Sequence, residues 1–154
     1  MMTNTIHFDQ ILLEVGVPNK KQMFQNIAST LSKKTGFSEQ QLLLKFLNQE
    51  EKEDSAIGNG VAIAHLPFTE MLDTKIILCR LKNNTEFNTP DNLPVDLFCI
   101  VLSPKENMGM GLQAVSSLSR IMNDPFLCDQ LRCLKTEEEI YAVMNERQII
   151  RRAA

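Results

Sequence analysis

The chain has 154 residues, 44% hydrophobic and 23% charged, and these proportions are typical of one soluble globular domain, which we expect to span 1–154. Its net charge of −3 argues against a broad electrostatic attraction for nucleic acid. No apolar run approaches the roughly 18 residues that a membrane helix needs, so we expect no membrane insertion. The amino terminus lacks the basic start and apolar stretch of a signal peptide, which predicts a cytoplasmic protein.

Two amphipathic helices are expected first along the chain. Apolar side chains recur at helical spacing from Asn19 to Thr35, and Gly36 ends this pattern. Ser38 then begins a second helix as its capping residue, and that helix ends in the charged run at 50–54.

A glycine-rich turn is expected after the second helix. Gly58 and Gly60 flank Asn59, and an Asn-Gly dipeptide tolerates the positive φ angles of a tight turn. The β-branched run at 61–63 then predicts a short strand. This strand would place His65 at its end, rigidly held but reachable by a partner.

The second half of the chain predicts two more strands and three helices. Strands are expected at 74–81 and 95–102, the second apolar enough to be central in a sheet covered on both faces. A helical stripe follows at 114–122, Asp124 opens a short helix, and Thr136 begins the last one. The expected fold is therefore single-domain α/β, with a mixed β-sheet flanked by helices on both faces.

The cysteines predict neither a disulfide framework nor a metal site. They show no C-x-x-C spacing, and Cys79 and Cys99 lie in apolar runs where a reduced thiol packs well. With His7 and His65 as the only histidines, a zinc site would need distant cysteines to converge. We expect no bound metal and no cofactor.

The imidazole of His65 has the most informative chemical context. Near pH 7 a neutral imidazole is a nucleophile, because its ordinary pKa of about 6.5 leaves a nitrogen lone pair free. The surrounding segment lacks the patterns of a catalytic triad, a zinc peptidase or a nucleotide-binding P-loop. Covalent phosphoryl transfer fits better, since it needs a reachable ring nitrogen, donors for the phosphoryl oxygens and a docking donor protein. The other interpretation is a structural histidine whose ring nitrogens only make hydrogen bonds within the protein.

Four sequence segments carry a resemblance that covers nearly the whole chain. Ile-Gly-Asn-Gly-Val-Ala-Ile-Ala-His at 57–65 is the most specific, and Asp-Asn-Leu-Pro-Val-Asp-Leu at 91–97 and the segments 128–132 and 137–141 follow it. They resemble the enzyme IIA domains of the bacterial phosphoenolpyruvate-dependent sugar phosphotransferase system, fructose/mannitol type, and within that family the nitrogen-regulatory proteins most closely. This resemblance implies that the chain is a single IIA type-2 domain.

The resemblance also implies a function. His65 would accept a phosphoryl group from the histidine of a small phosphocarrier protein, without a metal or a nucleotide. Target proteins such as kinases or transporters would then bind the chain according to its phosphorylation state.

The resemblance also marks supporting residues and departures. Ser55 has a hydroxyl where the family carries Thr or Ser, and backbone N–H groups around Asn59 and Gly111 could bind phosphate oxygens. The family has a proline, an arginine and a histidine where this chain has Ala64, Gln49 and Gly111. Gln49 offers only a neutral donor group, and losing one preorganised donor can cost on the order of 3 kcal/mol of transition-state stabilisation.

Three functions stay open on these grounds. The chain is a phosphoryl carrier that regulates its targets, a protein-binding regulator that no longer transfers phosphate, or a sugar-specific IIA subunit of a transporter.

Overall fold

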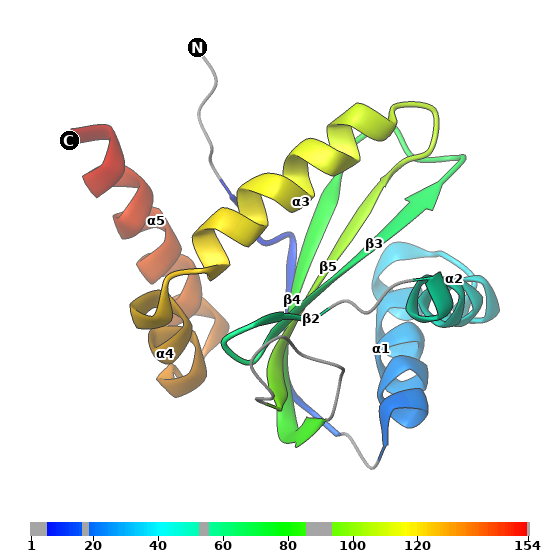
Figure 1. The fold of residues 1–154 in the computed structure, drawn as a ribbon, viewed down its shortest axis with the longest axis horizontal. Coiled ribbons are helices and arrows are strands. Elements are labelled where there is room, and N and C mark those ends of the chain that lie inside the picture. The colour runs from blue at the N-terminus through cyan, green and yellow to red at the C-terminus, as the bar shows by residue number, and fades with distance from the viewer. Residues whose placement is uncertain (1–5, 17–18, 53–55, 86–93, 154) are drawn as a thin grey trace.

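The computed structural model describes residues 6–16, 19–52, 56–85 and 94–153. Within these residues the chain forms five strands and five helices in one α/β unit (Figure 1). In chain order they are β1 (Gln10–Val15), α1 (Lys20–Thr35), α2 (Glu39–Lys52), β2 (Ala56–Gly58), β3 (Val61–Phe68), β4 (Lys75–Thr85), β5 (Val95–Pro104), α3 (Met108–Met122), α4 (Pro125–Cys133) and α5 (Glu137–Ala153).

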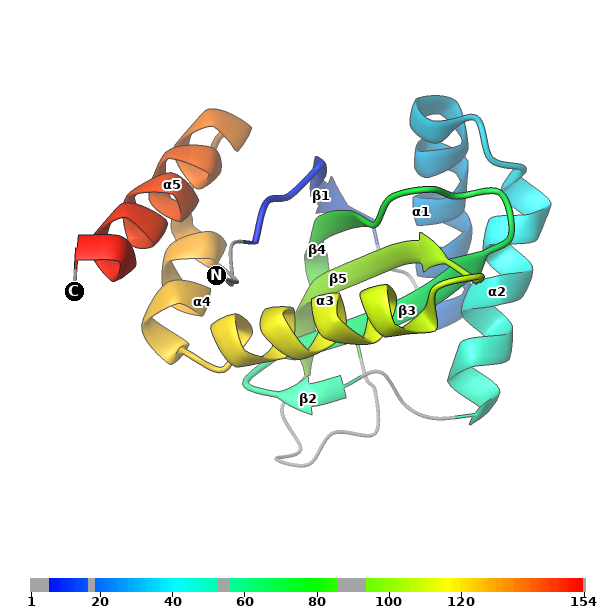
Figure 2. The same ribbon diagram turned by 90° about the horizontal axis from the view of Figure 1, so that it is seen from above.

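The strands form one mixed sheet in the order β1-β4-β5-β3-β2. β1 pairs parallel to β4 and β3 pairs parallel to β5, while the β4–β5 and β2–β3 pairs are antiparallel. Helices α1 and α2 cover one face, and α3, α4 and α5 cover the other (Figures 1 and 2). The expected mixed sheet with helices on both faces is therefore confirmed.

The central strand β5 divides the hydrophobic core in two. Its side chains alternate between the faces: Phe98 packs with Phe24 and Phe46 from the first two helices, and Cys99 packs with the cluster below α3, α4 and α5. Every residue from 97 to 104 is buried, as a strand covered on both sides requires.

Several helix ends follow the signals in the sequence. Asn19 accepts a hydrogen bond from the Gln22 N–H at 2.8 Å, and Gly36 ends α1 in the left-handed conformation. At the start of α5 the Thr136 hydroxyl accepts from the Glu139 N–H at 3.2 Å. The same hydroxyl donates to the Glu139 carboxylate at 3.0 Å, so the two side chains of this cap are joined directly.

The turn between β2 and β3 has the predicted positive φ angles. Asn59 lies at φ 58° and Gly60 at φ 75°, the signs that a type I′ hairpin turn requires. Arg132 of α4 holds this turn from outside, because its guanidinium donates to the Asn59 carbonyl and pairs with the Asp96 carboxylate at 2.8 Å. The hairpin is thereby tied to α4 and to the start of β5.

Three local expectations differ from the structure. The strand that begins at Val61 continues to Phe68, so His65 lies inside β3 and not at its end. Strands β1 and β2 were not expected from the sequence. Helix α3 begins at Met108, six residues before the apolar stripe that predicted it, because Asn107 caps it by accepting from the Met110 N–H at 3.2 Å.

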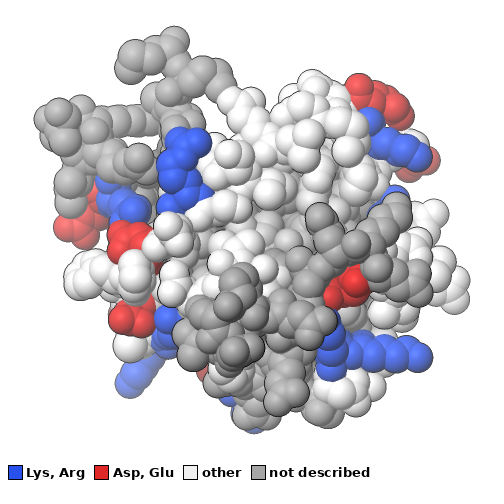
Figure 3. Space-filling view, in the orientation of Figure 1, with Lys and Arg blue, Asp and Glu red and all other residues white. Residues whose placement is uncertain are grey.

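The four cysteines of the chain all lie within the described residues. Cys79, Cys99 and Cys128 are buried, Cys133 is exposed, and all four are free thiols. Among the described residues, no helix has both the length and the apolar character to cross a membrane. On the face in Figure 3, the acidic and basic side chains of these residues are interspersed.

Candidate functional site

The imidazole of His65 lies half-buried between β5 and the first turn of α3. His65 pairs with Val101 in the β3–β5 register, and its ring points to the face that α3 covers. The ring Nε2 lies 2.6 Å from the hydroxyl of Ser103, a fully buried residue of β5. This hydrogen bond and the strand backbone fix the orientation of the ring.

Gly111 leaves the space in which this ring sits. A Cβ atom at residue 111 would lie 2.4 Å from the His65 Nε2 and 2.5 Å from the Ser103 Oγ. Real Cβ atoms do not approach other heavy atoms so closely, so the ring occupies the volume that any larger side chain at this position would need. In this chain the His65 ring therefore occupies the space that a side chain at position 111 would enter.

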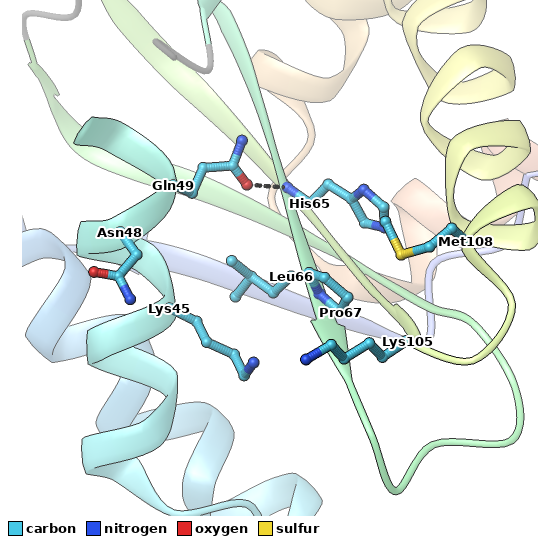
Figure 4. Close-up of a pocket in the computed structure, with 8 residues that line it drawn as sticks. All are labelled: Lys45, Asn48, Gln49, His65, Leu66, Pro67, Lys105 and Met108. Carbon is cyan, nitrogen blue, oxygen red and sulfur yellow. Dashed lines mark hydrogen bonds between the residues drawn. The ribbon is translucent and has the colours of Figure 1, made fainter. Parts of the chain in front are cut away.

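Gln49 of α2 binds the backbone of the same histidine. Its side-chain Oε1 accepts a hydrogen bond from the His65 N–H at 2.6 Å (Figure 4). The amide oxygen must face this N–H, because the amide nitrogen would place two donors against each other. The remaining donor of Gln49, its NH₂ group, is neutral.

A pocket of about 390 Å³, open to solvent, lies beside the ring. Helix α2 and the segment from β5 to α3 stand on either side of β3, and their side chains meet there (Figure 4). The pocket is lined by Lys45, Asn48, Gln49, His65, Leu66, Pro67, Lys105 and Met108.

Two lysines in this pocket were missed by the sequence reasoning. Lys45 precedes Gln49 by four residues on α2, and residues at this spacing share a helix face. Lys105 directly follows β5, which runs parallel to β3. It therefore lies at the C-terminal end of both strands, the end that follows His65 in β3. The positions of both lysines relative to these elements could be read from the sequence. Only the pairing of β3 with β5 shows that the two lysines line one pocket.

Of the remaining predicted residues, Asn59 is described and does not line the pocket. Asn59 lies in the turn at the opposite end of β3, where its carbonyl accepts from Arg132. Ser55 lies outside the described residues. The structure therefore brings Gln49 and Gly111 to His65 and leaves Asn59 apart. Within the same described residues, no cluster of three metal-ligating side chains occurs.

Burial lowers the pKa of His65 below its ordinary value, because the half-buried ring is poorly solvated in its charged form. The imidazole is consequently neutral at pH 7 and keeps a lone pair for nucleophilic attack.

Acidification should destabilise the wild-type protein more than a His65→Gln variant. Since the folded-state pKa is lowered, the unfolded chain takes up a proton at residue 65 first as the pH falls. The stability due to neutral His65 is complete above the unfolded pKa of about 6.5, and it is lost as the pH falls from there towards the folded-state pKa. Denaturant midpoints measured between pH 7.5 and 5 test this. A difference between the midpoints of the two proteins that stays constant over that pH interval would contradict the prediction.

Comparisons with known proteins agree with the fold. A family model described as the phosphoenolpyruvate-dependent sugar phosphotransferase system, EIIA 2, matches residues 4–147. A nitrogen regulatory protein of Klebsiella oxytoca is 27% identical over 146 residues, which cover 94% of this chain and 90% of that protein.

Two solved structures share the fold. The nitrogen regulatory protein IIA-Ntr from Neisseria meningitidis has a TM-score of 0.77 at 25% identity, covering 88% of this chain and 92% of that one. The mannitol enzyme IIA from Escherichia coli, solved in complex with phosphorylated enzyme IIB, has a TM-score of 0.71 over 92% of this chain and 98% of its own, at 16% identity. The expected similarity to nitrogen-regulatory IIA proteins is confirmed, and the chain belongs to the EIIA 2 family of the phosphoenolpyruvate-dependent sugar phosphotransferase system.

Proposed function

We propose that this chain is a phosphoryl carrier of the nitrogen-related phosphotransferase system. In this proposal His65 accepts a phosphoryl group from the histidine of a small phosphocarrier protein. The phosphorylated and unphosphorylated forms then bind different target proteins, such as kinases or transporters.

The placement of His65 is the observation that carries this proposal. Its ring is neutral, oriented by the Ser103 hydroxyl at 2.6 Å, and borders a solvent-open pocket. During transfer the N–P bond of the donor histidine breaks as an N–P bond to a ring nitrogen of His65 forms. Such a transfer needs positioning and electrostatic stabilisation of the phosphoryl oxygens, which a pocket with polar walls can provide.

The surroundings of the pocket suit a protein donor. Met108, Met110 and Leu112 on the first turns of α3 are exposed, as is Leu44 on α2. Arg120 is the only charged residue of α3, and uncharged atoms extend over this helix in Figure 3. A phosphoryl group adds a charge of about −1.5 to −2 beside these apolar side chains, which would change the partners that bind there.

A protein-binding regulator without phosphotransfer is the second candidate, and one observation favours it. The Gln49 amide oxygen is engaged by the His65 N–H, and Gly111 has no side chain, so neither position supplies a charged donor. The two candidates make opposite predictions for phosphoryl uptake.

Intact-mass measurement should show one added phosphoryl group on the wild-type protein. The protein is incubated with phosphoenolpyruvate, enzyme I and a nitrogen-type phosphocarrier, and the added mass should be acid-labile. It should disappear in His65→Gln, because that side chain has no nucleophilic ring nitrogen.

His7→Gln is the matched control, since His7 is the other histidine and its ring lies against Tyr141 at 5.8 Å between centroids. This variant should gain the same mass as the wild type. Absence of any gain in the wild type after long incubation would reject the carrier function and leave the regulator.

A further inference from the structure

Two lysine ammonium groups from different elements face each other across the pocket beside His65. Lys45 extends from α2 and Lys105 from the turn after β5, and Figure 4 shows their side chains pointing towards one another below the imidazole. Both residues line the same pocket as His65.

Phe68, the last residue of β3, positions both lysines. Its backbone carbonyl accepts a hydrogen bond from the Lys105 N–H at 2.8 Å. Its ring lies under the Lys45 ammonium, with Nζ 4.7 Å from the ring centroid, a favourable cation–π distance. Phe68, at the end of the strand that carries His65, therefore holds the two cations near each other.

Neither lysine has an acidic partner among the described residues, whereas some other basic side chains do. Lys20 pairs with Glu50, Arg132 with Asp96, and Arg147 with Asp124. The pKa of Lys45 is lowered, first by burial and then by the charge of Lys105, so the two ammonium groups repel each other. An anion between them would remove this repulsion.

We propose that Lys45 and Lys105 form an oxyanion site that holds the oxygens of the phosphoryl group at His65. In this role they supply the positive charge that Gln49 does not. A phosphoryl group has the matching chemistry, since it presents three oxygens and up to two negative charges to donors on one side. The role in transfer rests on the proposed function, but binding of free phosphate to the two lysines does not.

Titration with inorganic phosphate tests the site on the unphosphorylated protein. NMR of the lysine side chains and the His65 ring should show a saturable shift in the wild type. Lys45→Gln and Lys105→Gln should each weaken phosphate binding about tenfold, the loss expected for one hydrogen bond to a charged group. Lys45→Arg and Lys105→Arg should restore binding in large part, because the charge is retained.

Lys21→Gln is the matched control, because it removes the same charge from an exposed position on α1. It should change phosphate affinity less than twofold. Equal weakening in all three Gln variants would indicate an effect of net charge alone, and a non-saturable shift in the wild type would show that the pocket holds no phosphate. Either result would overturn the proposal.

Rates of phosphoryl uptake separate this inference from the proposed function. Lys45→Gln and Lys105→Gln should each accept the phosphoryl group from the phosphocarrier protein more slowly than the wild type and Lys21→Gln. If phosphate binds at the lysines but His65 is never phosphorylated, the carrier function fails and the oxyanion site stands. If His65 is phosphorylated equally fast in all variants and phosphate affinity is unchanged, the lysine site fails and the carrier function stands.

Discussion

Gly111→Ala should reduce the rate of phosphoryl uptake by His65 at least about 100-fold. The added Cβ would lie 2.4 Å from the His65 Nε2 and 2.5 Å from the Ser103 Oγ, so the ring must leave its present position. Ser103 is fully buried on the central strand and has little room to move. A misplacement of about 1 Å at a reacting group can cost about 100-fold in rate. Initial rates of mass gain from the phosphocarrier measure the effect.

Gly109→Ala provides a matched control in the same helical turn. The nearest atom to a Cβ at this position is the Asn107 Oδ1 at 3.7 Å, an ordinary van der Waals contact. This variant should take up phosphate at the wild-type rate, and its helix should be slightly stabilised, because Ala is a better helix former than Gly. If Gly111→Ala also transferred at the wild-type rate, the placement of the ring against α3 would not be the reactive one.

Gly60→Ala should lower the free energy of unfolding by about 3 kcal/mol. Gly60 has φ 75°, where a side chain costs about 1–2 kcal/mol. Its Cβ would also lie 2.6 Å from the Arg132 Nη2 and 2.9 Å from the Asp96 Oδ1, which would push apart the ion pair that holds the turn. Overpacking of this kind adds about 1–3 kcal/mol. Urea unfolding of the variant and the wild type measures the difference.

Gly36→Ala separates backbone strain from the steric clash at the ion pair. Gly36 has φ 82°, but a Cβ added there would have no other atom within 4 Å. The substitution should therefore cost only about 1–2 kcal/mol, the strain alone. Equal losses in Gly36→Ala and Gly60→Ala would mean that the added Cβ at residue 60 does not disturb the ion pair of Arg132 and Asp96.

Local signals in the sequence predicted the elements that depend on local interactions. The caps at Asn19 and Thr136 and the turn at Asn59 satisfy backbone groups within a few residues, so their side chains indicate them directly. The expected end of the strand at His65 was wrong, because pairing with β5 continues to Phe68. That pairing joins residues more than thirty positions apart, and no local pattern reports it.

The sequence pointed to His65 as the candidate reactive residue, but it did not predict most of the side chains around its ring. The motif ending at His65 identified the imidazole, and the resemblance directed attention to Gln49 and Gly111. Ser103 reads in the sequence as the polar end of an apolar strand, and Lys45 as one charge on an amphipathic helix. Only the order of the strands and the position of α2 bring these side chains to one ring.

The hydrogen bond between Gln49 and the His65 backbone also protects an open sheet edge. β2 pairs with β3 only near Val61 and Ala62, so the outer edge of β3 beyond them has no strand beside it among the described residues. Unpaired N–H groups on such an edge can recruit a strand from another molecule. The outward N–H of His65 is taken by Gln49, and residue 67, two positions further on the same side, is a proline without an N–H. His65 can thus lie at an accessible sheet edge without offering a template for aggregation.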